Sequence, residues 1–411
     1  MKFLTLAYDI LQWIGVFPQW IWSKWKLWVY SIYRIMIFVM IALFTVLMTV
    51  QMFVATDLTI LARTIDIWTM FLSGLYKWSC MSLFHEKFVK LKTKLIEIQV
   101  QGSVAFGRRS ADIFTTNYLK QTQKVTFGYM MSGLVAAGFL IMSPLLTYPK
   151  GGRSDFEYYN DPRSYPLSCW MPFMIDERWM FWTIFISQSI SLIVVVCMYL
   201  GIDSFMFGAI YTVGGQIELL NWALNSIKNS LEEIGSSTST DQLIQYTEKQ
   251  QMKCYSILRQ CVKHHILILN YIKMVHTLFS SLIIIDYLHG ITSVSFALFQ
   301  LTISRGIGEK ISVISFIALS VWHQFLNNFF GEFIIQKQLS VSVALYHIPW
   351  WRAGKSVRQL LSLMISRSIR PTFITGFYMY KLSYESFISF VKALYTYYMV
   401  LRRVNAEDKN A

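Results

Sequence analysis

Apolar stretches recur along the chain at the length needed to cross a lipid bilayer, and more polar segments of varying length separate them. Seven of these stretches predict membrane-spanning helices at residues 29–54, 58–83, 125–147, 178–201, 265–300, 311–335 and 383–403. About 20 apolar residues carry a helix across the hydrocarbon core. A β-barrel would instead show short segments of alternating polarity. The pattern therefore predicts an all-α polytopic membrane protein with seven transmembrane helices.

Composition points the same way. The 411 residues are 55% hydrophobic and 15% charged, whereas about a quarter of the residues of a soluble protein are charged. A net charge of +14 would be compatible with binding to nucleic acid. The basic residues, however, lie in the connections between apolar stretches, where they set the orientation of the spans, so we predict no nucleic-acid partner. The sequence has no phosphate-binding loop, nucleophile elbow or metal-binding motif, and we expect neither enzymatic activity nor a cofactor.

The charges of the connections predict how the helices are oriented. Eight Lys or Arg residues follow the second span, and six follow the sixth span against the single acid Glu332. The basic residues after the third span are matched by acidic ones. Because excess Lys and Arg stay in the cytoplasm, we expect a cytoplasmic N-terminus and an extracellular C-terminus. A G-protein-coupled receptor has the opposite orientation.

Several spans continue into amphipathic helices on the predicted cytoplasmic side. These extensions cover residues 84–100, 204–232 and 241–264, and the last two are separated by a break at residues 235–240. An amphipathic helix needs a partner for its apolar face. The pattern leaves two interpretations open: the helices lie on the membrane or pack within the subunit, or they form a cytosolic bundle where subunits meet.

Ionisable residues inside predicted spans are costly and are therefore candidates for function. Arg63 and Asp66 lie three residues apart in the second span and can form a self-neutralised pair. Lys77, near the inner end of the same span, can extend to the interface and is assigned no function. Asp286 could contact a partner helix, a water-filled cavity or a ligand. His323 is expected to be a hydrogen-bonded interior residue, and Gly290 could mark a bend.

Aromatic residues crowd the predicted outer halves of the spans. They could form an interfacial belt, which we favour for Trp179 and Trp182, or a small apolar ligand pocket with one or two polar anchors. The candidate pocket residues are Thr64, Trp68, Phe71, Phe139, Ser143, Phe181, Trp182, Phe185, Phe316, Ser320 and His323.

The C-terminal part of the chain carries the most specific pattern. Gly331-Glu332 leads to Ser340, a stretch with Pro349-Trp350-Trp351 and Arg370-Pro371 follows, and a last apolar helix extends from Leu382. The order, spacing and residue types of residues 331–403 resemble the signature region of insect odorant receptors. Trp13-Ile-Gly-Val-Phe-Pro near the N-terminus is similar to the Gly-aromatic-Pro opening of that family.

The last helix departs from the family's other branches. Gustatory receptors typically carry Gln-Phe where this chain has Arg403-Val404. The odorant co-receptor carries the same three residues as Met399-Val400-Leu401, but its sequence differs from this chain directly after them. The chain therefore looks like a tuning subunit. Val400 matches the gate valine of the family, and a ring of such residues could gate a pore by dewetting. The candidate pore and gate residues are Tyr397, Val400, Leu401, Arg403 and Val404. The alternative is an ordinary final span with basic stop residues.

The resemblance implies a subunit of a heterotetrameric channel. The family's ligand pocket is built from the second, third, fourth and sixth spans, and its partners are co-receptor subunits, a small volatile molecule, membrane lipid and permeant cations. The expected location is the plasma membrane of sensory-neuron dendrites. An anchor domain formed by cytosolic helix ends would hold the subunit contacts. The candidate interface residues are Tyr346, Trp350, Trp351, Leu361, Met364 and Pro371.

These expectations divide the chain into four parts. Residues 1–28 form a cytoplasmic segment, 29–335 the first six spans with the pocket, 336–382 the anchor segment, and 383–411 the pore-lining helix and a short tail. The predicted function is the odorant-binding subunit of a heteromeric ligand-gated non-selective cation channel. The alternatives are a gustatory-type homomeric channel, and a secondary transporter that would use Arg63, Asp66 and Asp286.

Overall fold

Helices make up nearly all of the regular structure. The computed structural model describes residues 5–16, 24–147, 154–235, 248–303 and 307–407. The elements are α1 (Thr5–Trp13), α2 (Lys24–Val54), α3 (Leu58–Leu83), α4 (His85–Phe106), α5 (Arg108–Thr147), α6 (Asp155–Asn160), η1 (Pro162–Ser164), α7 (Arg178–Gly235), α8 (Glu248–Ile303), α9 (Ile307–Tyr346), η2 (Trp350–Arg352), α10 (Lys355–Ser368), β1 (Thr375–Gly376), β2 (Tyr380–Lys381) and α11 (Tyr384–Glu407).

The predicted membrane class is confirmed. Among the described helices, α2, α3, α5, α7, α8 and α9 are long and apolar enough to cross a membrane, and they follow the first six predicted spans in order. Helix α11 occupies the seventh predicted span. It is more polar than the other six because Glu385, Lys392 and Arg403 interrupt its apolar residues.

Four of the spans are much longer than a bilayer is thick. Helix α7 has 58 residues, which corresponds to about 87 Å at 1.5 Å per residue, whereas the hydrocarbon core is about 30 Å thick. The predicted extension at 204–232 is continuous with α7, and the described part of the extension at 241–264, from Glu248 onward, is continuous with α8. The predicted break between them lies, after Gly235, outside the described residues. The predicted boundary between residues 335 and 336 falls inside α9.

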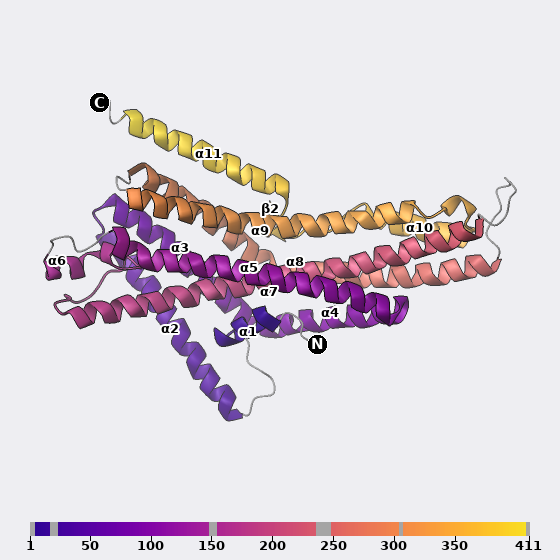
Figure 1. Ribbon diagram of the computed structural model, residues 1–411, viewed down its shortest axis with the longest axis horizontal. Helices are drawn as coiled ribbons and strands as arrows, with labels where there is room; N and C mark the ends of the chain where they lie inside the picture. Colours follow the sequence, from indigo (N-terminus) through magenta and orange to yellow (C-terminus); the bar gives the residue numbers. More distant parts are fainter. Residues whose placement is uncertain (1–4, 17–23, 148–153, 236–247, 304–306, 408–411) are drawn as a thin grey trace.

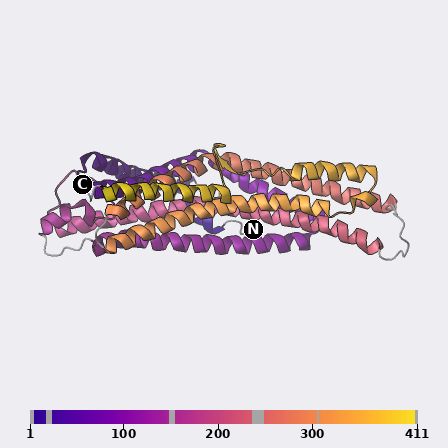
Figure 2. The same cartoon turned by 90° about the horizontal axis from the view of Figure 1, so that it is seen from above.

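The long helices run side by side along one axis, and they define two ends of the molecule (Figures 1 and 2). One end carries α6 and the loop before α7, and the opposite end carries α4 and α10 (Figure 1). Helix α2 leaves the bundle at an angle, and α11 lies along α9 toward the α6 end (Figure 1). We call these the α6 end and the α10 end.

The amphipathic helix predicted at 84–100 is α4, and its apolar face packs within the subunit. Phe88, Leu91, Leu95 and Ile98 are each at most 2% exposed. The rings of Phe88 and Phe279 of α8 meet edge to face, with their centroids 5.5 Å apart. Of the two interpretations of this stretch, packing inside the subunit is therefore the one observed for α4.

Two glycines allow neighbouring segments to approach a helix closely. Helix α8 continues through Gly290, where a Cβ atom would collide with the side chain of Gln324 on α9. Gly290 therefore allows α8 to pack closely on α9. In α9, a Cβ atom on Gly331 would collide with Leu382, just before α11. The Gly331-Glu332 motif thus marks where the chain leading into the last helix crosses α9.

A short β-hairpin joins α10 to α11, and the hydrophobic pattern did not predict it. Strands β1 and β2 are antiparallel, and the turn residues Phe377 and Tyr378 have positive φ angles of 45° and 60°. The backbone N–H of Phe377 donates to Oγ of Ser280 at 2.8 Å, and that of Thr375 donates to Nδ1 of His276 at 3.2 Å. These bonds fix the hairpin to α8.

Candidate functional site

A cavity of about 150 Å³ lies between the spans, in the part of the bundle toward the α6 end. Helices α5, α7 and α9 supply most of its wall, α8 adds two residues and α3 adds one. The lining consists of Met70, Tyr129, Gly133, Ala136, Ala137, Phe139, Leu140, Ser143, Val196, Tyr199, Leu200, His289, Gly290, Ser312, Ser315, Phe316, Leu319, Ser320 and His323.

Five of the residues predicted from the sequence come together in this wall. They are Phe139 and Ser143 of α5, and Phe316, Ser320 and His323 of α9. Aromatic rings and aliphatic side chains dominate the lining, with a few hydroxyl and imidazole groups between them. This is the composition of a site that holds a small apolar molecule by shape and fixes its orientation with a few polar groups.

Part of the cavity wall was not anticipated. Gly133, Ala136 and Ala137 of α5 expose little side chain, and the aromatic rings of Tyr129 and Tyr199 complete the wall. The signal in the sequence was the group of small residues Gly133, Ala136, Ala137 and Gly138 inside an apolar span. Such a group leaves space between helices unless large neighbours fill it.

Three predicted pocket residues of α3 lie away from this cavity. Thr64 donates to the carbonyl oxygen of Ile60 and is fully buried. The indole N–H of Trp68 donates to Oγ1 of Thr49 on α2 at 2.9 Å. Phe71 is completely buried in the main hydrophobic core. These side chains pack α3 against its neighbours.

The aromatic residues of α7 form a separate cluster at the α6 end. Phe181 and Phe185 are buried beside the tyrosines of α6 and of the following loop, Tyr158, Tyr159 and Tyr165. Trp182 is 39% exposed, as the interfacial-belt interpretation expects. The cluster covers the end of the bundle beyond the cavity.

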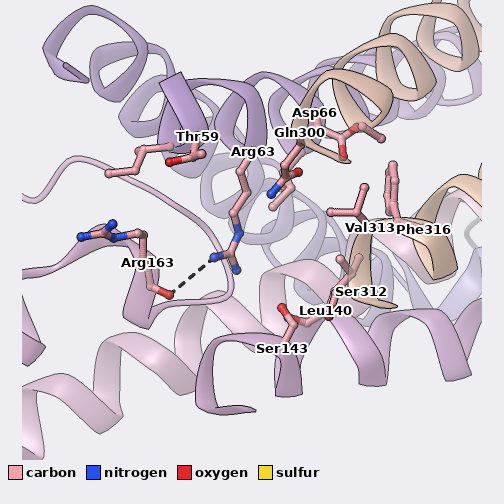
Figure 3. A pocket seen from close by; sticks show the side chains of 13 residues that line it. Thr59, Arg63, Asp66, Leu140, Ser143, Arg163, Gln300, Ser312, Val313 and Phe316 are labelled. Atoms are coloured by element: carbon pink, nitrogen blue, oxygen red, sulfur yellow. Dashed lines mark hydrogen bonds between the residues drawn. The ribbon is translucent and has the colours of Figure 1, made fainter. Parts of the chain in front are cut away.

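A second, smaller cavity of about 70 Å³ adjoins the first. Leu140, Ser143, Ser312 and Phe316 line both cavities. In Figure 3 Arg63 extends toward Arg163, whose carbonyl oxygen accepts a hydrogen bond from it. The guanidinium group also donates to the carbonyl oxygen of Tyr165 at 3.2 Å.

Asp66 also lines the smaller cavity, and its carboxylate accepts a hydrogen bond from the hydroxyl group of Ser293 on α8. Arg63 thus holds the loop before α7, while Asp66 joins α3 to α8. Both members of the predicted pair bind other elements of the fold.

Beneath the larger cavity lies a buried ionic cluster, formed by Lys77 of α3, Asp203 of α7 and Asp286 of α8. The ammonium nitrogen of Lys77 is 2.7 Å from a carboxylate oxygen of each aspartate. All three side chains are at most 4% exposed. The expectation that Lys77 extends to the membrane interface is therefore wrong, because the two carboxylates hold its ammonium group inside the bundle.

The cluster is hydrogen-bonded to the cavity wall. Nε2 of His323 lies 2.9 Å from Oδ2 of Asp203, and the hydroxyl group of Tyr129 donates to the same oxygen at 3.1 Å. The ammonium group of Lys77 also lies 4.0 Å from the centroid of the Tyr199 ring. His323 is thus the hydrogen-bonded interior residue that the sequence predicted.

The groups around Asp203 could suggest a metal site. Asp203, Asp286 and His323 offer ligand atoms that all lie within 4.8 Å of one another. The positive charge between the two carboxylates is nevertheless already supplied by Lys77. An ammonium group held by two carboxylates satisfies them without a cation from solution.

Helix α11 packs on the bundle with only one face. Phe390 and Leu394 are buried against Val294 of α8, together with partly buried residues of α9. On the remaining surface, Val391 and Val400 are 41% and 55% exposed, and Tyr397 is 38% exposed. Arg403 is also exposed, and the side chains of Leu401 and Val404 lie outside the described part of the chain.

The predicted interface residues separate into two groups at the α10 end. Tyr346, Trp350 and Trp351 are 68%, 43% and 53% exposed. Leu361 and Met364 are buried within the subunit, and Pro371 is half-buried. Leu363, which the sequence analysis did not single out, is 67% exposed on the other face of α10.

Comparison with known proteins places the chain in a family. A sequence profile described as 7tm Odorant receptor matches residues 63–395. Odorant receptor Or2 of Anopheles gambiae is 24% identical over 221 residues, which are 54% of this chain and 56% of that protein. The odorant receptor coreceptor of the same species is 22% identical over 156 residues, covering 38% of this chain and 33% of the coreceptor.

A solved structure shows the same fold. The insect olfactory receptor OR5 from Machilis hrabei in complex with eugenol superposes with a TM-score of 0.78 at 15% identity, covering 98% of this chain and 97% of that one. The chain aligns with about half the length of Or2 and with a shorter part of the coreceptor, which agrees with a tuning receptor rather than a coreceptor. The chain belongs to the 7tm odorant receptor family, and it is a multi-pass membrane receptor rather than an enzyme.

Proposed function

We propose that this chain is the odorant-binding subunit of a heteromeric ligand-gated cation channel, which a small apolar volatile opens. The observation that carries the proposal is the aromatic cavity of about 150 Å³ that α5, α7 and α9 mainly line. Its partners are co-receptor subunits in a heterotetramer, membrane lipid and permeant cations that pass without strong selection. The subunit acts in the plasma membrane of sensory-neuron dendrites.

The position of the cavity supports gating by ligand. A ligand shifts a conformational equilibrium only by binding one state better than the other. Because the cavity wall is shared among several spans, its shape depends on how these helices pack. A volatile molecule that fits the cavity of the open packing better than that of the closed packing would therefore favour the open channel.

Helix α9 and the hairpin offer a path from the cavity to the last helix. One turn beyond His323, the amide nitrogen of Asn328 donates to the hydroxyl group of Tyr380 in β2 at 2.7 Å. The amide oxygen of Asn328 accepts from the backbone N–H of Ser383 at 3.1 Å, directly before α11. The ring of Tyr380 stacks on Tyr287 of α8 with centroids 3.9 Å apart. A shift of α9 at the cavity would move the start of α11.

In this proposal α11 lines the pore. Its apolar residues outside the contact with α8 and α9, Val391 and Val400 among them, need partner subunits or lipid to cover them. Val400 would contribute to an apolar gate. Arg403 at the end of α11 would repel cations if it were present in every subunit, so a tetramer that also contains co-receptor subunits suits this sequence better.

The test is membrane current in a heterologous cell during application of a broad panel of volatiles. The chain is expressed alone and together with an odorant co-receptor. We expect ligand-evoked current only when both chains are present. Ligand-evoked current from this chain alone would favour a homomeric channel, and no current from either combination over the whole panel would contradict the proposed function.

A further inference from the structure

Two polar side chains one turn apart on α9 line the larger cavity with hydrogen-bonding capacity unused. His323 and Ser320 lie three residues apart, so they share one face of the helix. Within the described part of the chain, neither Nδ1 of His323 nor the hydroxyl group of Ser320 has a hydrogen-bond partner. By contrast, the hydroxyl group of Ser315 in the same wall donates to the carbonyl oxygen of Ile311 at 2.8 Å.

The ionic cluster determines which nitrogen of His323 carries the proton. A carboxylate only accepts hydrogen bonds, so Nε2 of His323, 2.9 Å from Oδ2 of Asp203, is the donor. The amide nitrogen of Asn327 is farther from Nε2, at 3.4 Å, and makes a weaker contact than the charge-assisted bond to Asp203. In the neutral imidazole, Nδ1 then presents a lone pair and accepts a hydrogen bond.

We propose that the cavity selects small apolar molecules that carry a hydroxyl group. This inference rests on the proposed function, in which the cavity is the ligand site. The ligand hydroxyl donates its hydrogen to Nδ1 of His323, and its oxygen accepts a hydrogen bond from Ser320. The apolar remainder of the ligand lies against the aromatic rings of Tyr129, Tyr199 and Phe316.

Other volatile classes satisfy only part of this arrangement. An aldehyde, a ketone or an ether accepts from Ser320 but offers no hydrogen to His323, so its oxygen faces a second acceptor. A hydrocarbon leaves both protein groups unpaired. An unpaired buried hydrogen-bonding group costs about 1–3 kcal/mol, which corresponds to roughly 5- to 150-fold in apparent affinity.

The test compares matched probes on cells that express this chain with an odorant co-receptor. For hexyl, octyl, benzyl and phenylethyl skeletons, the alcohol, the aldehyde, the methyl ether and the hydrocarbon are applied, and the half-maximal concentration for current is measured. We expect the alcohol to act at about tenfold lower concentration than its aldehyde and its ether. Equal or greater potency of the aldehydes or ethers would overturn the inference while leaving the proposed function intact. A receptor that no volatile opens would overturn both.

Variants of α9 assign the preference to particular atoms. The readout is the ratio of the half-maximal concentrations of ether and alcohol within one variant, so receptor abundance cancels. His323→Leu removes the acceptor, and its ratio should fall to about one. His323→Gln offers an amide donor to Asp203 and a carbonyl acceptor to the ligand, and its ratio should recover in part.

Two serine variants complete the test. Ser320→Ala should weaken the alcohol and the ether by a similar factor, because both accept from that hydroxyl group. Ser342→Ala is the matched control on the same helix. Ser342 lies outside the cavity wall and its hydroxyl group donates to the carbonyl oxygen of Leu339 at 2.7 Å, so its ratio should equal that of the unmodified receptor. An unchanged ratio in His323→Leu would exclude Nδ1 of His323 as the source of the preference, and a changed ratio in Ser342→Ala would contradict its assignment to the cavity.

Discussion

Lys77 lies fully buried, in an environment that is costly for a charged group. Removing an ammonium group and two carboxylates from water costs several kcal/mol for each ion, and their attraction offsets this cost only when the geometry is good. Here both oxygen–nitrogen distances are 2.7 Å, and the three residues come from α3, α7 and α8. The cluster therefore holds three spans in one register beneath the cavity.

Replacing Lys77 by Met should strongly destabilise the receptor, because it leaves two carboxylates buried without their cation. We expect a loss of about 3–5 kcal/mol, measured as a lower melting temperature of the detergent-solubilised receptor. The exposed Lys90→Met of α4 is the matched control and should leave the melting temperature nearly unchanged. The double variant Lys77→Met with Asp286→Asn should regain part of the loss. Equal melting temperatures for Lys77→Met and Lys90→Met would contradict the role of the cluster.

The cluster also shows what sequence analysis misses at the scale of single residues. Lys77 lies near the end of its apolar stretch, where a lysine ordinarily extends to the interface. Asp203 lies just beyond the predicted fourth span (178–201) and before the predicted extension (204–232), and nothing in the sequence singles it out. Only the continuity of α7 through residue 203 places this carboxylate inside the bundle. Asp286 was recognised because apolar residues flank it on both sides, whereas its partners depend on how three helices pack.

At the scale of elements, the contact between α9 and the start of α11 depends on the absence of a side chain at Gly331. Gly331→Ala should displace Leu382 and the start of α11, because the added Cβ atom would collide with the main chain of Leu382. We expect ligand-evoked current to fall severalfold at equal surface abundance. Gly128→Ala in α5 is the control, because no neighbouring atom lies within 4 Å of its added Cβ. Alanine is also the better helix former by about 1 kcal/mol. A full response from Gly331→Ala would show that this contact can relax.

The bonds between Asn328 and the hairpin test the proposed path from the cavity to α11. Asn328→Ala would leave the hydroxyl group of Tyr380 and the backbone N–H of Ser383 without this partner. We expect the maximal current to fall while surface abundance and the alcohol preference are kept, because the change affects transmission rather than the cavity. Gln336→Ala, which removes an exposed bond to Glu332 on the same helix, should leave the current unchanged. A lower maximal current in both variants would indicate a general effect of altering α9.

The helices themselves could be predicted, because long apolar stretches specify them directly. Residues 58–83 coincide with α3, and the other predicted spans lie almost entirely within observed helices. The hairpin between α10 and α11 could not be found in this way. Its strands have two residues each, and its turn uses Phe377 and Tyr378 at positive φ, where glycine or asparagine would have been the recognisable signal. Contacts with α8 and α9, rather than local preference, specify this segment.

At the scale of the whole molecule, the distribution of basic residues predicts which end faces the cytoplasm. The α10 end carries Lys355, Arg358 and Arg367, and the loops of the α6 end pair Arg163 with Asp57 and Asp161. Hydrogen bonds from Thr59 lower the pKa of Asp57, so this carboxylate stays charged at the α6 end. We expect an epitope added after Ala411 to be stained in intact cells, and one added before Met1 to be stained only after permeabilisation. The reverse pattern would contradict the orientation and place the cavity toward the cytoplasm.

The exposed aromatic residues of the α10 end predict where subunits meet. Trp350 and Trp351 are 43% and 53% exposed at the end that we expect to lie in the cytosol, where lipid cannot cover them. Tryptophan is enriched among the residues that dominate binding energy at protein interfaces, and its truncation there typically costs 2 kcal/mol or more. The double variant Trp350→Ala with Trp351→Ala should therefore reduce co-purification with the co-receptor at least tenfold, while the monomer melts normally.

The exposed, stacked pair Trp25 and Trp28 at the start of α2 provides the matched control. These residues are at least as exposed as the first pair. They belong to the first turns of α2, a helix apolar enough to cross the membrane that leaves the bundle at an angle (Figure 1), and lipid headgroups can cover them there. Replacing both by alanine should leave co-purification unchanged. If instead the Trp25 and Trp28 variant loses the co-receptor and the Trp350 and Trp351 variant keeps it, then the subunits meet along α2. In that case the α10 end must be covered by something other than the co-receptor.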